Sequence, residues 1–273
     1  MPAIDNIGNS ITSIPLTDQG STPTTPSSGK TRIYTKSDGL YIVNAAGTVT
    51  GPLAVSSTGA AADGWTAATG TWTYASATTI TVPSGAAAIY SVGDKVKLTQ
   101  TTVKYFYIVN VADTLLTVTA GSDYSVANAA ITSPYYSHTT TPVGFPTFFN
   151  YSPSIAAAGA STPPSYSTVL AHFSLNGKWC NLLVDLDNSS GGTAGSGADV
   201  ILIGFPIAQK SSLNKSIGSG TNYEAGGTNA GIYVRSYSTT QMYFTKSDMT
   251  GISCNDQSST VRYFVFEAQY LIA

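Results

Sequence analysis

Charged side chains are scarce in this chain. Asp, Glu, Lys and Arg make up 10% of its 273 residues, against about 25% in an ordinary soluble domain. Ser, Thr, Ala and Gly take their place, together with 17 tyrosines and 9 phenylalanines. Exposed helices in water are rich in Glu, Lys, Arg and Gln, whereas Thr, Val, Ile, Tyr and Phe fit pleated surfaces. The composition therefore predicts an all-β fold.

The same scarcity of charge bears on how the chain meets other molecules. Exposed sheet edges usually carry Lys or Pro, which prevent pairing with neighbouring chains. A net charge well away from zero also keeps copies of a protein apart, and here the net charge is only −2. We therefore expect much of the surface to be covered by other subunits.

The charge distribution and the hydropathy argue against two kinds of partner. There is no block of basic residues to contact phosphates, so no nucleic-acid partner is expected. No apolar run reaches the roughly 18 residues that span a bilayer, so no membrane insertion is expected. The opening residues, MPAID, lack the basic region and apolar core of a signal peptide. This predicts synthesis and folding in a cytoplasm.

Residues 1–29 are rich in Pro, Thr and Ser, and large apolar side chains are few after Leu16. A segment of this kind buries too little surface to fold by itself. We expect an extended N-terminal arm. It is either a loose terminus or an anchor laid on a larger particle, and composition leaves both readings open.

Residues 30–60 are expected to form a β-hairpin anchoring module. Short strands are predicted at 32–35 and 40–43, joined by the turn Ser37-Asp38-Gly39. The run from Arg32 to Leu53 resembles a hairpin module found near the N-termini of phage tail-fibre and other virion proteins, although Gly39 is followed here directly by Leu40. The resemblance implies attachment to other virion proteins through the N-terminal region.

Residues 61–142 are expected to form a small β-barrel or sandwich, because short strand-like runs alternate with turn signals every 10 to 15 residues. The run 103–111 is apolar on both faces, which predicts a central strand. The other expected strands are 70–74, 78–82, 95–99, 115–119 and a weak one near Ile131. Residues 143–165, rich in Pro, Ala, Gly and Ser, are expected to be a linker.

Residues 166–273 are expected to form a C-terminal jelly-roll-like β-sandwich. The expected strands are 168–175, 178–186, 199–205, 231–237, 242–245 and 261–272, with long turns at 188–197 and 218–229. The sequence around Asn176-Gly177-Lys178-Trp179 and Ile203-Gly204-Phe205-Pro206 resembles the C-terminal domains of trimeric phage fibre and head-decoration proteins. That resemblance implies a homotrimer.

Few residues are placed for catalysis or metal binding. The two histidines, His138 and His172, are too few for a structural zinc site. Asp185 and Asp187 would share one face of a strand, as calcium binding or glycoside hydrolysis would require. Aspartates that end a strand and open a turn are more often hydrogen-bonding residues. We expect no enzyme activity, no cofactor and no metal.

Two cysteines, Cys180 and Cys254, complete the set of reactive side chains. The sequence leaves open whether they lie close together or are separate buried apolar residues.

Tyrosines are the best candidates for a binding surface, because a tyrosine offers contact area together with a polar tip. Tyr223, between Asn222 and Glu224 in an expected turn, and Tyr237 are the predicted receptor-binding residues. In a β-sandwich such tyrosines are just as often ordinary strand residues.

These observations lead to one main hypothesis and two alternatives. The main hypothesis is a structural component of a tailed-phage exterior (fibre, spike or decoration subunit) that assembles as a homotrimer in the virion. The sequence leaves open whether it contacts host-surface polysaccharide or only reinforces the particle. The first alternative is a bacterial carbohydrate-binding or adhesin module that acts as a monomer. The second is a polysaccharide depolymerase, which typically needs a long repetitive β-helix and clustered carboxylates.

Overall fold

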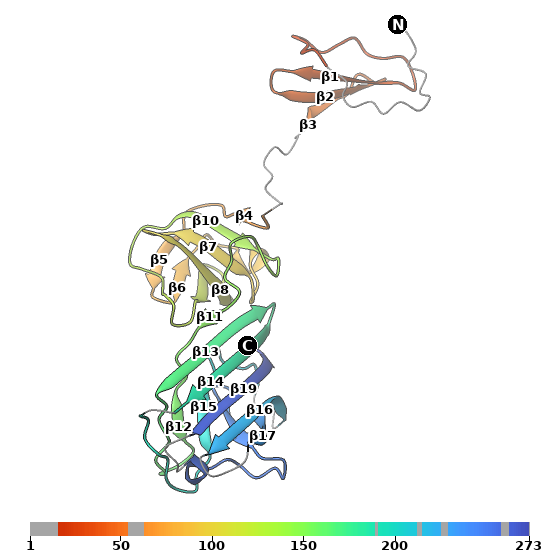
Figure 1. The fold of residues 1–273 in the computed structure, drawn as a ribbon. Coiled ribbons are helices and arrows are strands. Elements are labelled where there is room, and N and C mark those ends of the chain that lie inside the picture. Colours follow the sequence, from red (N-terminus) through yellow and green to blue (C-terminus); the bar gives the residue numbers. More distant parts are fainter. Residues whose placement is uncertain are drawn as a thin grey trace. The chain divides into compact units, whose positions relative to one another are not determined.

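The computed structural model of the protein describes residues 16–53, 63–188, 191–211, 215–224, 229–257 and 262–272. The chain divides into two compact units, Met1–Ala62 and Asp63–Ala273. The described residues form strands β1 to β19 and two four-residue helical turns, α1 (Ala86–Ile89) and η1 (Cys254–Gln257). Figure 1 shows these strands gathered into separate sheets. The predicted all-β fold is confirmed.

The N-terminal unit is a three-stranded antiparallel sheet in the order β1-β2-β3. Its strands are β1 (Thr31–Lys36), β2 (Gly39–Asn44) and β3 (Val49–Leu53). The two expected strands at 32–35 and 40–43 are thus present. Of the expected arm, residues 1–15 lie outside the described part, and Asp18 makes a parallel bridge to Thr35 at β1.

The second unit begins with a seven-stranded antiparallel sheet in the order β4-β10-β7-β8-β9-β6-β5. The run 103–111 forms β8, the middle strand, as its two apolar faces predict. The bounds are β4 (Thr66–Ala67), β5 (Thr73–Ser76), β6 (Thr79–Thr81), β7 (Lys95–Thr99), β8 (Val103–Ala112), β9 (Leu115–Thr119) and β10 (Thr132–Ser137).

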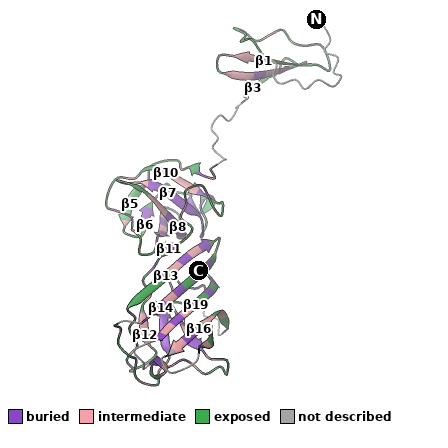
Figure 2. Cartoon of the chain, viewed as in Figure 1, coloured by how far each residue is buried: buried purple, intermediate pink, exposed green. Residues whose placement is uncertain are grey.

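A nine-stranded antiparallel sheet follows, in the order β11-β13-β14-β19-β16-β17-β18-β15-β12. Along β14 and β19 every second residue is buried, which is the period of a strand with one face on a core. Figure 2 shows this alternation along β13 and β14. The expected sandwich is therefore built from one continuous sheet that curls around its own core. Its bounds are β11 (Phe149–Asn150), β12 (Ile155–Ala157), β13 (Thr168–Asn176), β14 (Trp179–Asp187), β15 (Ile201–Gly204), β16 (Ser216–Glu224), β17 (Ala230–Ser236), β18 (Gln241–Thr245) and β19 (Arg262–Leu271).

Two segments differ from the sequence-based expectation. Residues 143–165, expected to be a linker, contain β11 and β12, which pair with β13 and β15 and form the two edges of the nine-stranded sheet. Residues 218–229, expected to be a turn, contain most of β16, which lies between β19 and β17. β11 and β12 are two and three residues long and β16 consists mostly of small residues, so neither segment shows a clear alternation of polar and apolar side chains.

The two sheets of the second unit share one hydrophobic core rather than forming separate modules at 61–142 and 166–273. The Tyr107 ring of β8 lies edge-on to Phe149, with ring centroids 5.5 Å apart. Gly93 approaches the backbone of Gly177, and Gly121 approaches that of Asn150, so closely that neither glycine leaves room for a Cβ atom. The sheets are therefore packed backbone against backbone at this junction.

Asp199 connects the segment after β12 to the start of β15 and gives a pH-dependent prediction. Its carboxylate accepts hydrogen bonds from the Ser161 hydroxyl (2.7 Å) and the Ser161 N–H (2.9 Å). These two bonds, the hydroxyl first, lower the pKa of Asp199 in the folded protein. The resulting stabilisation is complete above the unfolded-state pKa of about 4 and is lost as the pH falls through the lower folded-state pKa.

We therefore expect the melting temperature of the wild-type chain to fall more between pH 5 and pH 3 than that of Asp199→Asn, which has no charge to lose at this site. Calorimetry over this range measures the difference. Equal falls for the two proteins would contradict the role given to this carboxylate.

Candidate functional site

The side of the nine-stranded sheet that faces away from its core is the candidate site. We call it the outer face: it consists of the residues of β13, β14, β19, β16 and β17 that alternate with core residues. Strand register places these residues in rows. One row contains His172, Leu183, Glu267, Ser219 and Tyr233, and the adjacent row contains Ser174, Asn181 and Gln269.

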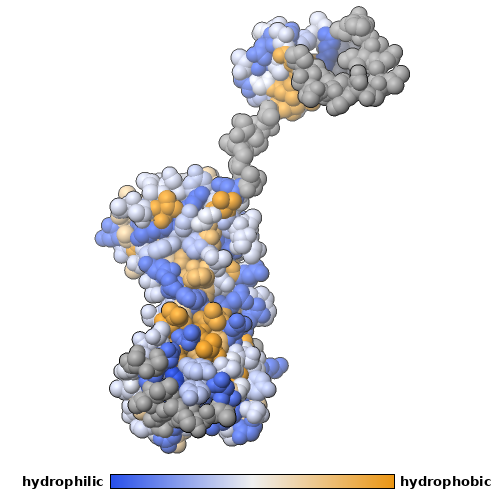
Figure 3. Space-filling view, in the orientation of Figure 1, coloured by the Kyte–Doolittle hydropathy of each residue, from blue (hydrophilic) through white to orange (hydrophobic). Residues whose placement is uncertain are grey.

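Large apolar side chains are concentrated on and beside this face. On or beside this face, six large apolar side chains are 39% to 51% exposed: Phe148, Leu170, Trp179, Leu183, Tyr233 and Leu271. Figure 3 shows apolar surface gathered in this part of the second unit. Single exposed apolar residues are normal on proteins, whereas a group of them on one face marks a contact surface.

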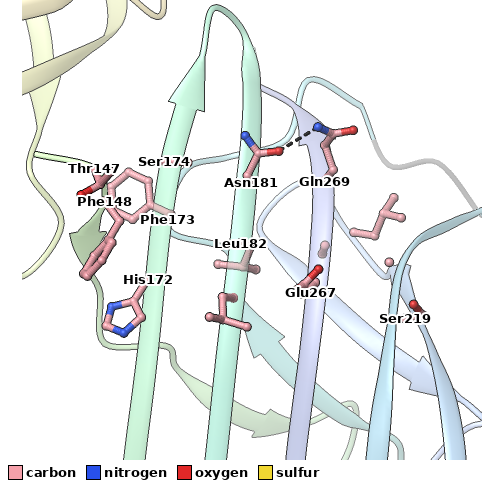
Figure 4. Close-up of a pocket in the computed structure, with 14 residues that line it drawn as sticks. Thr147, Phe148, His172, Phe173, Ser174, Asn181, Leu182, Ser219, Glu267 and Gln269 are labelled. Atoms are coloured by element: carbon pink, nitrogen blue, oxygen red, sulfur yellow. Dashed lines mark hydrogen bonds between the residues drawn. The ribbon is translucent and has the colours of Figure 1, made fainter. Parts of the chain in front are cut away.

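A hollow of about 670 Å³ lies on the outer face. Its floor is formed by β13, β14, β19 and β16, and Thr147 and Phe148, just before β11, line one side. Figure 4 shows the side chains of Asn181, Gln269 and Glu267 on neighbouring strands of this floor.

Two amide side chains are linked across the floor of the hollow. Gln269 Nε2 donates a hydrogen bond of 2.7 Å to Asn181 Oδ1 (Figure 4). Within the described part of the chain, no hydrogen bond uses Asn181 Nδ2 or Gln269 Oε1. The pair is therefore held in place by one bond and presents a donor and an acceptor side by side.

An aromatic contact forms the side of the hollow. The rings of Phe148 and His172 lie 4.4 Å apart at an interplanar angle of 44°. The pairing of Asn150 with His172 fixes β11 beside β13, and this brings Phe148 over the histidine. Phe148 nevertheless remains 48% exposed, so a large part of its surface is open to a ligand.

The other residues with potential chemistry are dispersed. Asp185 and Asp187 both lie on the outer face of β14, and the pKa of Asp185 is raised by burial and then by the charge of Asp187. His138 follows β10, and its Nδ1 lies 2.9 Å from the Asp94 carboxylate. His172 lies in β13 of the nine-stranded sheet, whereas His138 follows β10 of the seven-stranded sheet, so the two histidines belong to different sheets. No group of three or more metal-ligating residues occurs among the described residues.

Cys180 and Cys254 are both free and buried, in β14 and η1. Burial raises the pKa of the Cys180 thiol to about 12 and also raises that of Cys254. Since the thiolate is the reactive form, these cysteines act as small apolar core residues.

The predicted receptor residues Tyr223 and Tyr237 are not brought together. Tyr223 lies in β16 rather than in a turn, and its ring stacks on Tyr263 with 5.2 Å between centroids. Tyr237 follows β17 at the opposite end of the β16–β17 pair and is 48% exposed. A strand the length of β17 spans roughly 20 Å. Receptor binding by these two residues stays a prediction, and they cannot form one compact site.

The hollow was missed from sequence because its residues come from four distant segments. Asn181 and Gln269 are neighbours only through the register of β14 and β19. The alternation of polar Asn181, Glu267 and Gln269 with core residues indicates an outward face. It gives no information about which outward residues share a row.

No protein-family model, curated protein or solved structure matches this chain. None of the helical turns in the described residues is long and apolar enough to span a bilayer. We therefore infer the function from the geometry of the two units and of the outer face.

Proposed function

We propose that this protein is a structural subunit of the exterior of a tailed-phage particle, a fibre, spike or decoration protein, and that it assembles as a homotrimer. In this role the N-terminal unit attaches to other virion proteins, and the unit of residues 63–273 is the presented body. The work of the protein is then binding and assembly. The hairpin and C-terminal resemblances support the phage setting.

The observation that carries the proposal is how little the N-terminal sheet buries. Its buried hydrophobic cluster consists of Tyr34, Tyr41 and Val43 on one face. On the opposite face Ile33, paired with Ile42, is 58% exposed. A three-stranded sheet with so small a core gains stability by covering its open face with another surface. An attachment module has this property, because its partner completes the core.

The second unit supports the proposal because its hydrophobic core, unlike that of the N-terminal sheet, is large. Its core runs through both sheets and includes large buried side chains such as Trp72, Phe264 and Phe266. A body with this core holds its shape without a partner, as the presented part of a particle must. Its exposed outer face then offers surface for contacts with copies of the chain or with a host.

The oligomeric state tests this proposal. We expect light scattering at micromolar concentration to give three times the chain mass, and an unboiled denaturing gel to show a band that boiling shifts to the monomer. Ile33→Glu, on the open face of the N-terminal sheet, should leave the trimer intact, because the body supplies the subunit contacts. A monomer at these concentrations would contradict the trimer and favour the monomeric adhesin alternative.

A further inference from the structure

The hollow combines two kinds of surface that few ligands match together. Phe148 and Leu183 offer exposed apolar area, at 48% and 43% exposure. Between and beside them lie hydroxyl, amide and carboxylate groups of Ser219, Gln269 and Glu267. A sugar ring has the complementary pattern, with an apolar C–H face and hydroxyl groups around its edge. Aromatic rings pack against such faces, and polar side chains bind such edges.

The amide pair is arranged for neighbouring hydroxyl groups. Asn181 Nδ2 can donate and Gln269 Oε1 can accept, and the bond between the two side chains holds both atoms in place. Adjacent hydroxyls of a sugar each donate and accept, so they can satisfy both groups at once. An acyl chain would instead cover these amides and Glu267 without replacing their hydrogen bonds to water, which costs free energy.

The charge of the residues that line the hollow narrows the class of ligand further. Among the residues that the structure describes, Glu267 is the only Asp, Glu, Lys or Arg side chain that lines the hollow. A ligand with a phosphate, sulfate or carboxylate would meet this carboxylate with no lysine or arginine to bind the anion. The lining therefore disfavours anionic ligands such as sialic acids, uronic acids and nucleic acid.

From this chemistry we infer that the hollow is a binding site for a neutral saccharide. Its volume of about 670 Å³ falls in the range of small-molecule sites, about 300–1,000 Å³. Phe148 forms the apolar platform, the Asn181–Gln269 pair binds adjacent hydroxyls, and Glu267 accepts from another hydroxyl while rejecting anions. This extends the proposed function by giving the presented body a ligand class. Saccharide binding and trimer formation are measured separately, so either can fail alone.

The test uses the full chain and a defined panel of probes. Neutral di- to tetrasaccharides of glucose, galactose, mannose and N-acetylglucosamine are compared with sialylated and uronic-acid oligosaccharides by saturation-transfer NMR and calorimetry. We expect binding within the neutral set and none, or at least 10-fold weaker binding, in the anionic set. Glu267→Gln should reduce the ratio of neutral to anionic saccharide affinity at least 3-fold. Glutamine removes the negative charge that repels anions and keeps the shape of the side chain.

Two variants locate the site, and two act as matched controls. Phe148→Ala and Gln269→Ala should each weaken binding of the best neutral probe at least 10-fold. Tyr223→Ala and Tyr237→Ala test the receptor residues predicted from sequence, which lie outside the hollow; if the hollow is the saccharide site, they should change binding less than 2-fold. All four side chains are at least partly exposed, and an unchanged melting temperature confirms that each variant is folded.

Three results would overturn the inference. The first is that no neutral probe binds at millimolar concentration. The second is tighter binding of the anionic set. The third is that the two tyrosine variants abolish binding while Phe148→Ala and Gln269→Ala retain it, which would place the site at the residues predicted from sequence.

Discussion

Replacing Arg262 by alanine is expected to lower the free energy of unfolding of the second unit by about 4 kcal/mol, because a buried, charged hydrogen-bond donor is lost. Arg262 opens β19 and is fully buried. Its Nη2 donates a 2.7 Å hydrogen bond to the Ser165 carbonyl and another bond to the Thr193 carbonyl. These carbonyls belong to two segments far from β19 in sequence, so one side chain holds three parts of the chain together.

The surroundings of Arg262 show why alanine cannot substitute. The guanidinium lies 5.4 Å from the centroid of the Tyr166 ring, a cation–π contact of about 2 kcal/mol in a desolvated setting. Burial raises the pKa of Tyr166, against the opposing effect of the arginine. Truncation would leave a cavity beside this ring and remove the hydrogen-bond donor to the Ser165 and Thr193 carbonyls.

Urea denaturation followed by tryptophan fluorescence measures the loss. Arg235→Ala is the matched control, because Arg235 is a half-buried arginine on the outer side of β17, where it contacts the Met249 sulfur. We expect this control to cost less than about 1 kcal/mol. A similar, small cost for both variants would show that Arg262 is dispensable.

The strands that were predictable from sequence are those whose two faces meet different surroundings. The alternation of polar and apolar residues in Lys95–Thr99 and Trp179–Asp187 is a local property, so β7 and β14 could be found within a residue or two of their bounds. The two-sided apolar run of β8 likewise predicted a central strand. Single residues depart from the pattern, since Lys95 of β7 is buried and Leu183 of β14 is exposed.

The curled sheet and the hollow were not predictable, because both depend on which strands become neighbours. Asn181 and Gln269 meet only after β14 and β19 pair in one register. The edge strands β11 and β12 have two and three residues, too few to show a period. The junction between the sheets depends on Gly93 and Gly121, and glycine has no side chain whose pattern could indicate packing.

Strand β16 is the clearest case of a strand hidden by composition. Its sequence, SIGSGTNYE, has the small polar residues of a turn, and this composition predicts a turn at Gly218 and Gly220. In the structure the two glycines face the core side of the sheet and lie against the backbone of β19. Glycine is required at these two positions because β16 and β19 approach too closely for a Cβ atom. This is a packing requirement, not a requirement for turn geometry.

The second prediction follows from that close approach. Gly220→Ala is expected to lower the free energy of unfolding by about 3 kcal/mol, near the upper end for overpacked sites. The added Cβ would lie 2.6 Å from both Cα and Cβ of Phe266 and would clash with the Val265 carbonyl oxygen. These are mainly backbone atoms of β19, so relief requires two central strands to move apart.

Gly231→Ala on the adjacent strand β17 is the matched control. Gly231 pairs with Thr221, the residue after Gly220, but a Cβ there would meet no atom within 4 Å. Neither glycine has a positive φ, so the two substitutions differ in packing and not in backbone strain. We expect Gly231→Ala to be neutral or slightly stabilising, by up to about 1 kcal/mol, because alanine loses less backbone entropy on folding. Urea denaturation of both variants measures the contrast, and a Gly220→Ala variant as stable as Gly231→Ala would disprove the close packing of β16 on β19.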